Sequence, residues 1–235
     1  MLASARVRYA TIAGMQPHIH LRDEGGARVP VLVWRFAEPV RAISSGPLGG
    51  GIGTRHWVLN ASVPMDYDRP DPDAHLAEIA SGLGLAGPGV GLMTGVDVAD
   101  FVATGDAGVS VVATVGLGDP VWAAAPPDTG PVTPGTVNVV ARVPAVLAPA
   151  ALVNAVATVA EAKAQALREL GLAATGTATD ATCVLCPTGP ATEAYGGPRS
   201  RWGARLARAV HAAVLAGGRT WLDGGRAWLE REVGT

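Results

Sequence analysis

The chain has 235 residues, of which 49% are hydrophobic and 16% are charged, with a formal net charge of -2. This balance excludes an intrinsically disordered chain, and the lack of a basic surplus argues against a general nucleic-acid binder. No apolar run approaches the roughly 20 residues that cross a bilayer. The N-terminus lacks the pattern of a secretory signal, so we expect a cytoplasmic protein without a membrane partner.

The first sixty residues are predicted to form strands separated by turns. β-Branched and aromatic residues, bounded by glycine and proline, indicate strands at 6–12, 29–36, 40–44 and 57–63. The glycine-rich segment 46–53 lies between the last two strands. It could approach a ligand closely because most of its residues lack a Cβ. Residues 1–39 have no expected role beyond added sheet.

The middle of the chain mixes helices and strands. Asp71, Pro72 and Asp73 are typical of a helix start, and the helix should run to about Leu83. A second, short helix is predicted at 96–102. Strands are predicted at 90–93, 109–115 and 136–143, with a loop at 128–134.

Two long helices dominate the C-terminal part. The first covers 150–170 and ends at Gly171, and the second runs from about Trp202 to Leu215, closing at Gly217-Gly218. Residues 180–186 between them alternate as a strand does. We therefore predict a single domain over 1–235, of the α/β or α+β class, with a mixed β-sheet layered against the two C-terminal helices.

Cysteine and histidine do not form a metal-binding pattern. The only cysteines, Cys183 and Cys186, would point to opposite faces of a strand, so we expect buried structural thiols. The five histidines do not have the spacing of a metal site. The sequence therefore predicts no tightly bound metal.

The helix at 150–170 carries polar residues at spacings of four and three, which place them on one face. These are Asn154, Thr158, Glu161, Gln165 and Arg168, and the apolar side would comprise Val153, Val156, Ala157, Ala160, Ala164 and Leu167. Either the polar face is solvated, or Asn154 and Glu161 face a cleft. Lys163 lies on another face, where a surface position is expected.

The segment from Thr175 to Asp180 concentrates three hydroxyls, a carboxylate and a glycine at the junction of two elements. Each hydroxyl can donate, accept or become a nucleophile, so the segment could bind or attack a polar group. The alternative is that the threonines only cap and turn the chain.

Four other places offer groups that could bind a substrate. A serine pair and the glycine loop could form an anion cradle, a buried asparagine needs partners, a strand face presents two polar side chains, and a glycine turn precedes a helix N-terminus. The residues are Ser44, Ser45, Gly49 and Gly50; Asn60; Thr136 and Asn138; and Gly196 and Gly197.

Several short motifs occur in an order that resembles a known family. They are Ile43-Ser44-Ser45 with the glycine loop, Val58-Leu59-Asn60-Ala61, Gly91-Leu92-Met93-Thr94, Gly135-Thr136-Val137-Asn138, Glu161-Ala162-Lys163, Gly176-Thr177-Ala178-Thr179-Asp180 and Gly196-Gly197. From about residue 40 to 215, the chain resembles the adenosylcobinamide amidohydrolases of corrinoid salvage. It departs from the expected Thr-Glu-Ala-Lys by having Ala160 before Glu161, so a catalytic hydroxyl is not expected there.

The resemblance implies hydrolysis of the amide that joins a corrin side chain to aminopropanol, giving adenosylcobyric acid and 1-amino-2-propanol. Such a reaction needs a nucleophile, an oxyanion site and an acid. Thr177 or Thr179 could supply the hydroxyl, with Asp180 or Glu161 handling protons. Lys163 could activate a hydroxyl instead if it is buried. Asn138, Asn60 and the glycine-loop amides are candidate oxyanion donors.

Two other functions fit the same residues. A non-catalytic corrinoid binder or carrier would also need a broad apolar cleft with polar anchors. An amidase or acyltransferase for another small substrate is the third possibility. No tightly bound cofactor is expected, because cobalt would enter only with the corrinoid substrate, and the sequence makes no prediction about the oligomeric state.

Overall fold

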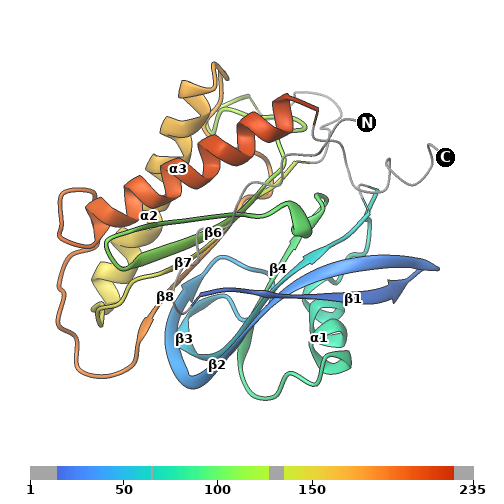
Figure 1. Cartoon of the computed structure of the whole chain (residues 1–235), viewed down its shortest axis with the longest axis horizontal. Helices are drawn as coiled ribbons and strands as arrows, with labels where there is room; N and C mark the ends of the chain where they lie inside the picture. The colour runs from blue at the N-terminus through green and yellow to red at the C-terminus, as the bar shows by residue number, and fades with distance from the viewer. Residues whose placement is uncertain (1–14, 65, 127–134, 225–235) are drawn as a thin grey trace, which may run out of the picture.

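The computed structural model describes residues 15–64, 66–126 and 135–224. Figure 1 shows the helices α2 and α3 packed beside the part of the sheet that contains β6 and β7, whereas α1 lies near β4. The elements are β1 (His18–Glu24), β2 (Ala27–Ser44), β3 (Gly51–Ser62), α1 (Pro72–Gly82), β4 (Gly89–Thr94), the 3-10 helix η1 (Val98–Asp100), β5 (Val102–Asp106), β6 (Val109–Val115), β7 (Val137–Arg142), α2 (Pro149–Glu169), β8 (Ala181–Pro187) and α3 (Gly203–Leu222).

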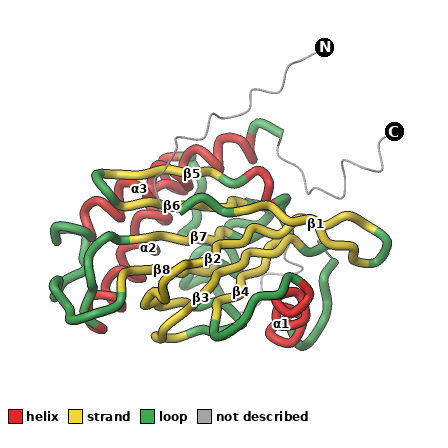
Figure 2. The backbone as a smooth tube through the Cα atoms, turned by 60° about the horizontal axis from the view of Figure 1, so that its bottom comes forward, coloured by secondary structure: helices red, strands yellow, loops and turns green. Residues whose placement is uncertain are grey.

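The strands form one mixed sheet in the order β4-β3-β2-β8-β7-β6-β5, and β1 pairs with β2 outside this path. The pairs β3–β4 and β7–β8 are parallel, and the other pairs are antiparallel. The register of β2 shifts between Arg35 and Val40. Its first half pairs with β1 and its second half with β8, so this long strand joins the two halves of the sheet (Figure 2).

The sheet curls until its two halves share an inner core. Val58 and Val90, from β3 and β4, belong to the same buried cluster as Val112 and Val140, from β6 and β7. On the outer side, α2 and α3 cover β5 to β8, and α1 covers β2 and β3. Burial on both faces explains why the seven residues of β6 are all buried instead of alternating with exposed ones.

The predicted fold class is confirmed, because a mixed sheet is layered against two long C-terminal helices. Residues 29–36 and 40–44, predicted as separate strands, are parts of the single bent strand β2. The predictions at 6–12 and 128–134 fall outside the described residues. Among the described helices, none is long and apolar enough to cross a membrane.

Two predicted helices have the wrong extent. At 96–102 only η1 is helical, because the Asp97 side chain accepts a bond from the Ala99 amide and caps a single turn, after which β5 pairs with β6. The last helix does not close at Gly217-Gly218 but continues to Leu222. A Cβ at Gly217 would lie 2.6 Å from a Val115 methyl group, so glycine serves here for close packing.

The buried face of α2 also differs from the predicted one. Thr158, expected on the polar face, is buried and donates to the Gly196 carbonyl at 2.9 Å. Val153, expected on the apolar side, is 56% exposed. Alanines occur all around this helix, so hydrophobicity alone does not define its contact with the sheet and α3.

The two thiols are buried on opposite faces of β8, as predicted. Cys183 belongs to the inner core, and Cys186 belongs to the core under α2 and α3. Burial raises the pKa of the Cys183 thiol to about 12, although a hydrogen bond with Ser44 acts against this shift. Burial also raises the pKa of Cys186.

We predict that neither thiol reacts with a thiol-specific reagent in the native protein at mildly alkaline pH, because little thiolate forms and the reagent cannot reach it. Both cysteines should react once the chain is unfolded in guanidinium. The measurement is the absorbance of the aromatic thiolate that an aromatic disulfide reagent releases when it reacts with a thiol. Glutathione is the reactive control. Rapid labelling of native protein would contradict the burial described here.

Candidate active site

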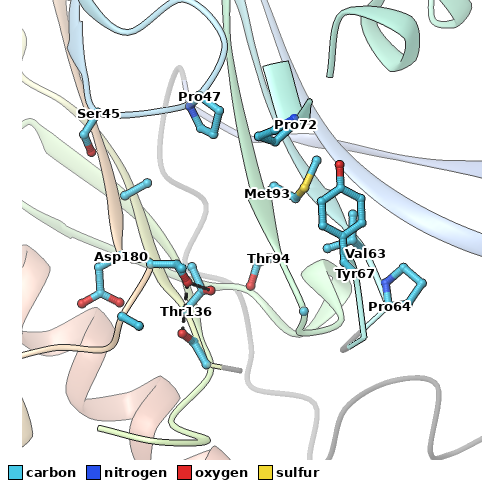
Figure 3. Close-up of a pocket in the computed structure, with 15 residues that line it drawn as sticks. Ser45, Pro47, Val63, Pro64, Tyr67, Pro72, Met93, Thr94, Thr136 and Asp180 are labelled. Atoms are coloured by element: carbon cyan, nitrogen blue, oxygen red, sulfur yellow. Dashed lines mark hydrogen bonds between the residues drawn. The ribbon is translucent and has the colours of Figure 1, made fainter. Parts of the chain in front are cut away.

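A pocket of about 530 Å³ opens at one end of the curled sheet. Figure 3 shows Met93 and Val63, at the ends of β4 and β3, on one side of the pocket and Thr136 and Asp180, at the starts of β7 and β8, on the other. A volume of this size is typical of small-molecule sites. The pocket therefore lies where residues far apart in the sequence converge.

Two threonine hydroxyls form a pair in the pocket wall. The Oγ1 atoms of Thr136 and Thr179 are 2.7 Å apart, and Thr179 Oγ1 also lies 3.3 Å from the Gly135 carbonyl oxygen. Either hydroxyl can donate in the 2.7 Å contact, and when Thr136 donates, the proton of Thr179 is left with only the longer contact to Gly135. This hydroxyl can turn toward a polar group in the pocket.

Directly after Thr179, the carboxylate of Asp180 accepts four hydrogen bonds. The Val137 amide donates to Oδ1 at 2.8 Å, and the Thr177 amide donates to Oδ2 at 2.9 Å. The Thr177 hydroxyl binds Oδ1, and the Lys163 ammonium binds Oδ2. A carboxylate offers about four lone-pair positions, so Asp180 has no free position for another donor.

The side chain of Lys163 is partly buried, contrary to the expected surface position. Its side chain is 14% exposed and that of Asp180 is 13% exposed, and the two form an ion pair. The pair joins α2 to the start of β8. Because a carboxylate without its partner is costly to bury, the ion pair with Lys163 stabilises the conformation of the loop that carries Thr179.

A glycine next to this ion pair has no room for a side chain. A Cβ on Gly176 would lie 2.6 Å from both Asp180 Oδ2 and Lys163 Nζ. The loop is also fixed from the other side, because the Val121 amide donates to the Gly176 carbonyl at 2.8 Å. The predicted cluster in 175–180 is therefore an ordered structure, not a free turn.

Beside the pocket, three buried polar side chains cross the inner face of the sheet. Asn138 Nδ2 donates to Asn60 Oδ1 and to the Met93 carbonyl, both at 2.9 Å. Asn60 Nδ2 donates to Thr114 Oγ1 at 3.0 Å. Two acceptors around Asn138 Nδ2 fix the orientation of its amide. Among the described residues, Asn138 Oδ1 is buried without a hydrogen-bond partner.

The two serines of the pair, Ser44 and Ser45, have different roles. The buried Ser44 hydroxyl accepts from the Gly46 amide at 2.9 Å and so shapes the start of the glycine loop. Ser45 lines the pocket, and its hydroxyl accepts from the Thr182 amide at 3.1 Å. Only Ser45 is therefore placed to contact a molecule in the pocket.

The glycine loop packs against the sheet instead of forming an anion cradle in the pocket. A Cβ on Gly49 would lie 1.9 Å from the Gly89 carbonyl, and Gly49 has a positive φ of 69°. Its own carbonyl accepts bonds from the Arg55 guanidinium. Neither Gly49 nor Gly50 lines the pocket, so the close approach made possible by glycine is to β4.

Four further residues that were predicted to face a site do not join the cluster. Glu161 is on the exposed side of α2, away from the buried side that carries Lys163. Gly196 packs against α2, where a Cβ would lie 2.0 Å from the Ala151 carbonyl oxygen. Neither Gly196 nor Gly197 lines the pocket, and Asn154 is exposed as well.

Tyr67, Met93 and Thr94 line the pocket but were not among the predicted site residues. Met93 and Thr94 belong to one of the recognised motifs, which was the available signal for them, whereas nothing near Tyr67 in the sequence indicates a site. Among the described residues, no group of three or more His, Cys, Asp or Glu side chains could hold a metal ion.

Comparisons with known proteins converge on one description. The sequence model of a family described as adenosylcobinamide amidohydrolase matches residues 15–225. A protein named adenosylcobinamide amidohydrolase from Methanosarcina mazei is 29% identical over 185 residues, which cover 75% of this chain and 88% of that protein. A protein of the same name from Halobacterium salinarum is 42% identical over 115 residues, or 46% of this chain and 49% of that protein.

We predict that Gly176→Ala destabilises the protein by about 1–3 kcal/mol, because the added methyl group must displace the Lys163–Asp180 pair. Urea unfolding followed by circular dichroism measures the change. Gly82→Ala, at the end of α1 with no atom within 4 Å of the new Cβ, is the matched control and should be neutral or slightly stabilising. Equal stability of the two variants would show that the ion pair does not need this space.

Proposed function

The chain belongs to the adenosylcobinamide amidohydrolase family, and on this basis we propose that it hydrolyses the amide bond of adenosylcobinamide in the pocket beside Thr136 and Thr179. Water adds across the carbon–nitrogen bond, so that the acyl carbon keeps an oxygen and the nitrogen leaves as an amine. The products are adenosylcobyric acid and 1-amino-2-propanol, as the resemblance of the motifs implies. The reaction is a step of corrinoid salvage.

The observation that carries this proposal is the hydroxyl pair in the pocket wall, supported by a buried ion pair. Thr179 lines the pocket and, when Thr136 donates to it in the hydroxyl pair, can donate its own proton to the oxygen of a substrate amide. That oxygen gains negative charge when the carbonyl is attacked, and a donor fixed in advance stabilises it. Asp180 and Lys163 hold the loop in position without needing to touch the substrate.

Thr179, not Thr177, is the threonine that meets the substrate in this proposal. Thr177 is buried, and its hydroxyl is bound to Asp180. A nucleophilic Thr179 would need an adjacent base, but its two described partners are a hydroxyl and a carbonyl oxygen. Since Asp180 already accepts four bonds, we propose that a water molecule attacks and that Thr179 stabilises the oxyanion.

Asn138 supports the pocket from behind its wall. It follows Thr136 by two residues, so the two side chains lie on the same face at the start of β7. Asn138 and Asn60 are buried and do not line the pocket, and Asn138 donates to the carbonyl of the lining residue Met93. We therefore assign Asn138 and Asn60 to positioning the pocket wall, not to binding the substrate.

The opposite wall of the pocket is suited to an apolar surface. It includes Val63, Pro64 and Met93. The pocket is too small to enclose a whole adenosylated corrin ring, so it would take the aminopropanol arm and one edge of the ring. No cofactor is needed, since cobalt enters with the substrate. We place the enzyme in the cytoplasm, where its two unpaired thiols remain reduced.

Turnover is the direct test of this function. Purified protein is incubated with adenosylcobinamide, and release of 1-amino-2-propanol is measured by chromatography and mass spectrometry. Product formation is the expected result. Tight binding without product would support a corrinoid carrier instead, and the absence of both would favour an amidase for another substrate.

We predict that Thr179→Val lowers kcat/KM by about 10²–10³-fold, the usual effect of removing an oxyanion donor. Thr188→Val, at an exposed position after β8, is the matched control and should keep full activity. Glu161→Gln should also keep full activity, because Glu161 lies on the exposed side of α2. Full activity of Thr179→Val, or an acyl group trapped on Thr179 in the mass spectrum, would contradict the assigned role.

A further inference from the structure

Behind the apolar wall of the pocket, a tyrosine is hydrogen-bonded to a buried histidine, and a glutamate carboxylate lies next to the other nitrogen of that histidine. Tyr67 lines the pocket, and its hydroxyl lies 3.1 Å from His75 Nδ1 (Figure 3 shows Tyr67). His75, on α1, is buried, and its Nε2 atom lies 3.4 Å from Glu24 Oε1 at the end of β1. These residues come from β1, α1 and the loop before α1, and none was indicated by the sequence motifs.

The partners determine which atom of His75 carries the proton. The carboxylate of Glu24 only accepts, so His75 Nε2 carries a hydrogen, and Nδ1 of the neutral ring is an acceptor. The Tyr67 hydroxyl therefore donates its single proton to Nδ1. Its oxygen then has only lone pairs left for the pocket.

The surroundings of His75 favour the neutral ring. Burial lowers the pKa of His75 from its ordinary value, and the charges of Arg69 and Arg22 act in the same direction. Glu24 and Glu78 act in the opposite direction without reversing the shift. Burial also raises the pKa of Tyr67, so the phenol keeps its proton at neutral pH.

We propose that Glu24 and His75 orient Tyr67 as a fixed hydrogen-bond acceptor in the pocket wall, where it binds an N–H or O–H donor of the substrate. The proposal rests on the proposed function for the identity of that substrate. Adenosylcobinamide offers several such donors: the primary carboxamides of the corrin ring, the hydroxyl and the amide N–H of the aminopropanol arm, and the hydroxyl and amino groups of the adenosyl ligand. Tyr67 is the binding residue, and His75 and Glu24 are positioning residues.

Protonation of His75 would change Tyr67 from a hydrogen-bond acceptor into a donor toward the pocket. Nδ1 of the charged ring donates to the Tyr67 oxygen, so the phenol turns its own O–H toward the pocket. A substrate donor would then meet another donor. Since the pKa of His75 is below its ordinary value of 6.5, affinity should be constant at neutral pH and fall as the pH decreases below that value.

The test compares kcat and KM for adenosylcobinamide in wild type, Tyr67→Phe, Glu24→Gln and the double variant. A glutamine at position 24 can donate to Nε2, which places the ring hydrogen on Nδ1 and turns the phenol into a donor. Each single variant should raise KM about 3–10-fold, which is the effect of losing one neutral hydrogen bond. The kcat of each variant should stay within about 2-fold of the wild-type value. The double variant should show no further rise, because both changes remove one interaction.

Asp23→Asn is the matched control, because this neighbouring carboxylate is 84% exposed. It should leave KM unchanged. The decrease in affinity at acidic pH should disappear in Tyr67→Phe. Wild-type KM in Tyr67→Phe, or a full effect of Glu24→Gln in the Tyr67→Phe background, would overturn the proposal.

A substrate analogue identifies the donor. In the propylamide of adenosylcobyric acid, the hydroxyl is absent and the ring carboxamides remain. If the ratio of KM in the variant to KM in wild type falls to one with this analogue, the donor is the hydroxyl of the arm. If the ratio persists, the donor is one of the N–H or O–H groups that the analogue retains. A ratio of one with both substrates overturns the acceptor role. If wild type releases no aminopropanol, the proposed function fails, and the same comparison is made with dissociation constants from absorbance titration.

Discussion

The four hydrogen bonds around the Asp180 carboxylate are the constraint on which the site depends. They connect α2 through Lys163, the loop before β8 through Thr177 and the first residue of β7 through its backbone amide. A buried carboxylate must have such partners, since an unpaired charge in this position would be strongly unfavourable. Because all four partners are needed at once, the loop has one conformation, and Thr179 is fixed at the pocket wall.

The curl of the sheet is the second constraint on the site. It brings polar side chains from distant strands together on an otherwise apolar inner face. Asn60 and Asn138 lie on strands that are not neighbours in the sheet order, yet their side chains are hydrogen-bonded. Such a bond requires that β3 fold back toward β7. The bend in β2 between Arg35 and Val40 provides this geometry. The same bend brings the ends of β3 and β4 to the pocket, opposite the threonine pair.

Glycine contributes to this architecture mainly by allowing close packing. Gly49 lies against the backbone of β4, Gly217 against Val115 and Gly176 against the Lys163–Asp180 pair. In the sequence, these positions resemble a ligand-binding loop, a helix end and a flexible turn. A glycine that is needed for a turn and one that is needed for a contact look the same in one sequence, because the atom that would clash belongs to a distant residue.

The sequence by itself determined the fold class, the long helices, most of the strands and the opposite burial of Cys183 and Cys186. These follow from periodicity, strand alternation and short motifs, which are local properties of the chain. Only the tertiary structure decided that Lys163 is partly buried while Glu161 is exposed, since every face of α2 carries alanines and the sheet selects which one is covered. It also decided that Glu24 meets Tyr67 and His75, because contacts of β1 with α1 and the loop before it depend on how the sheet curls, and no local pattern encodes that curvature.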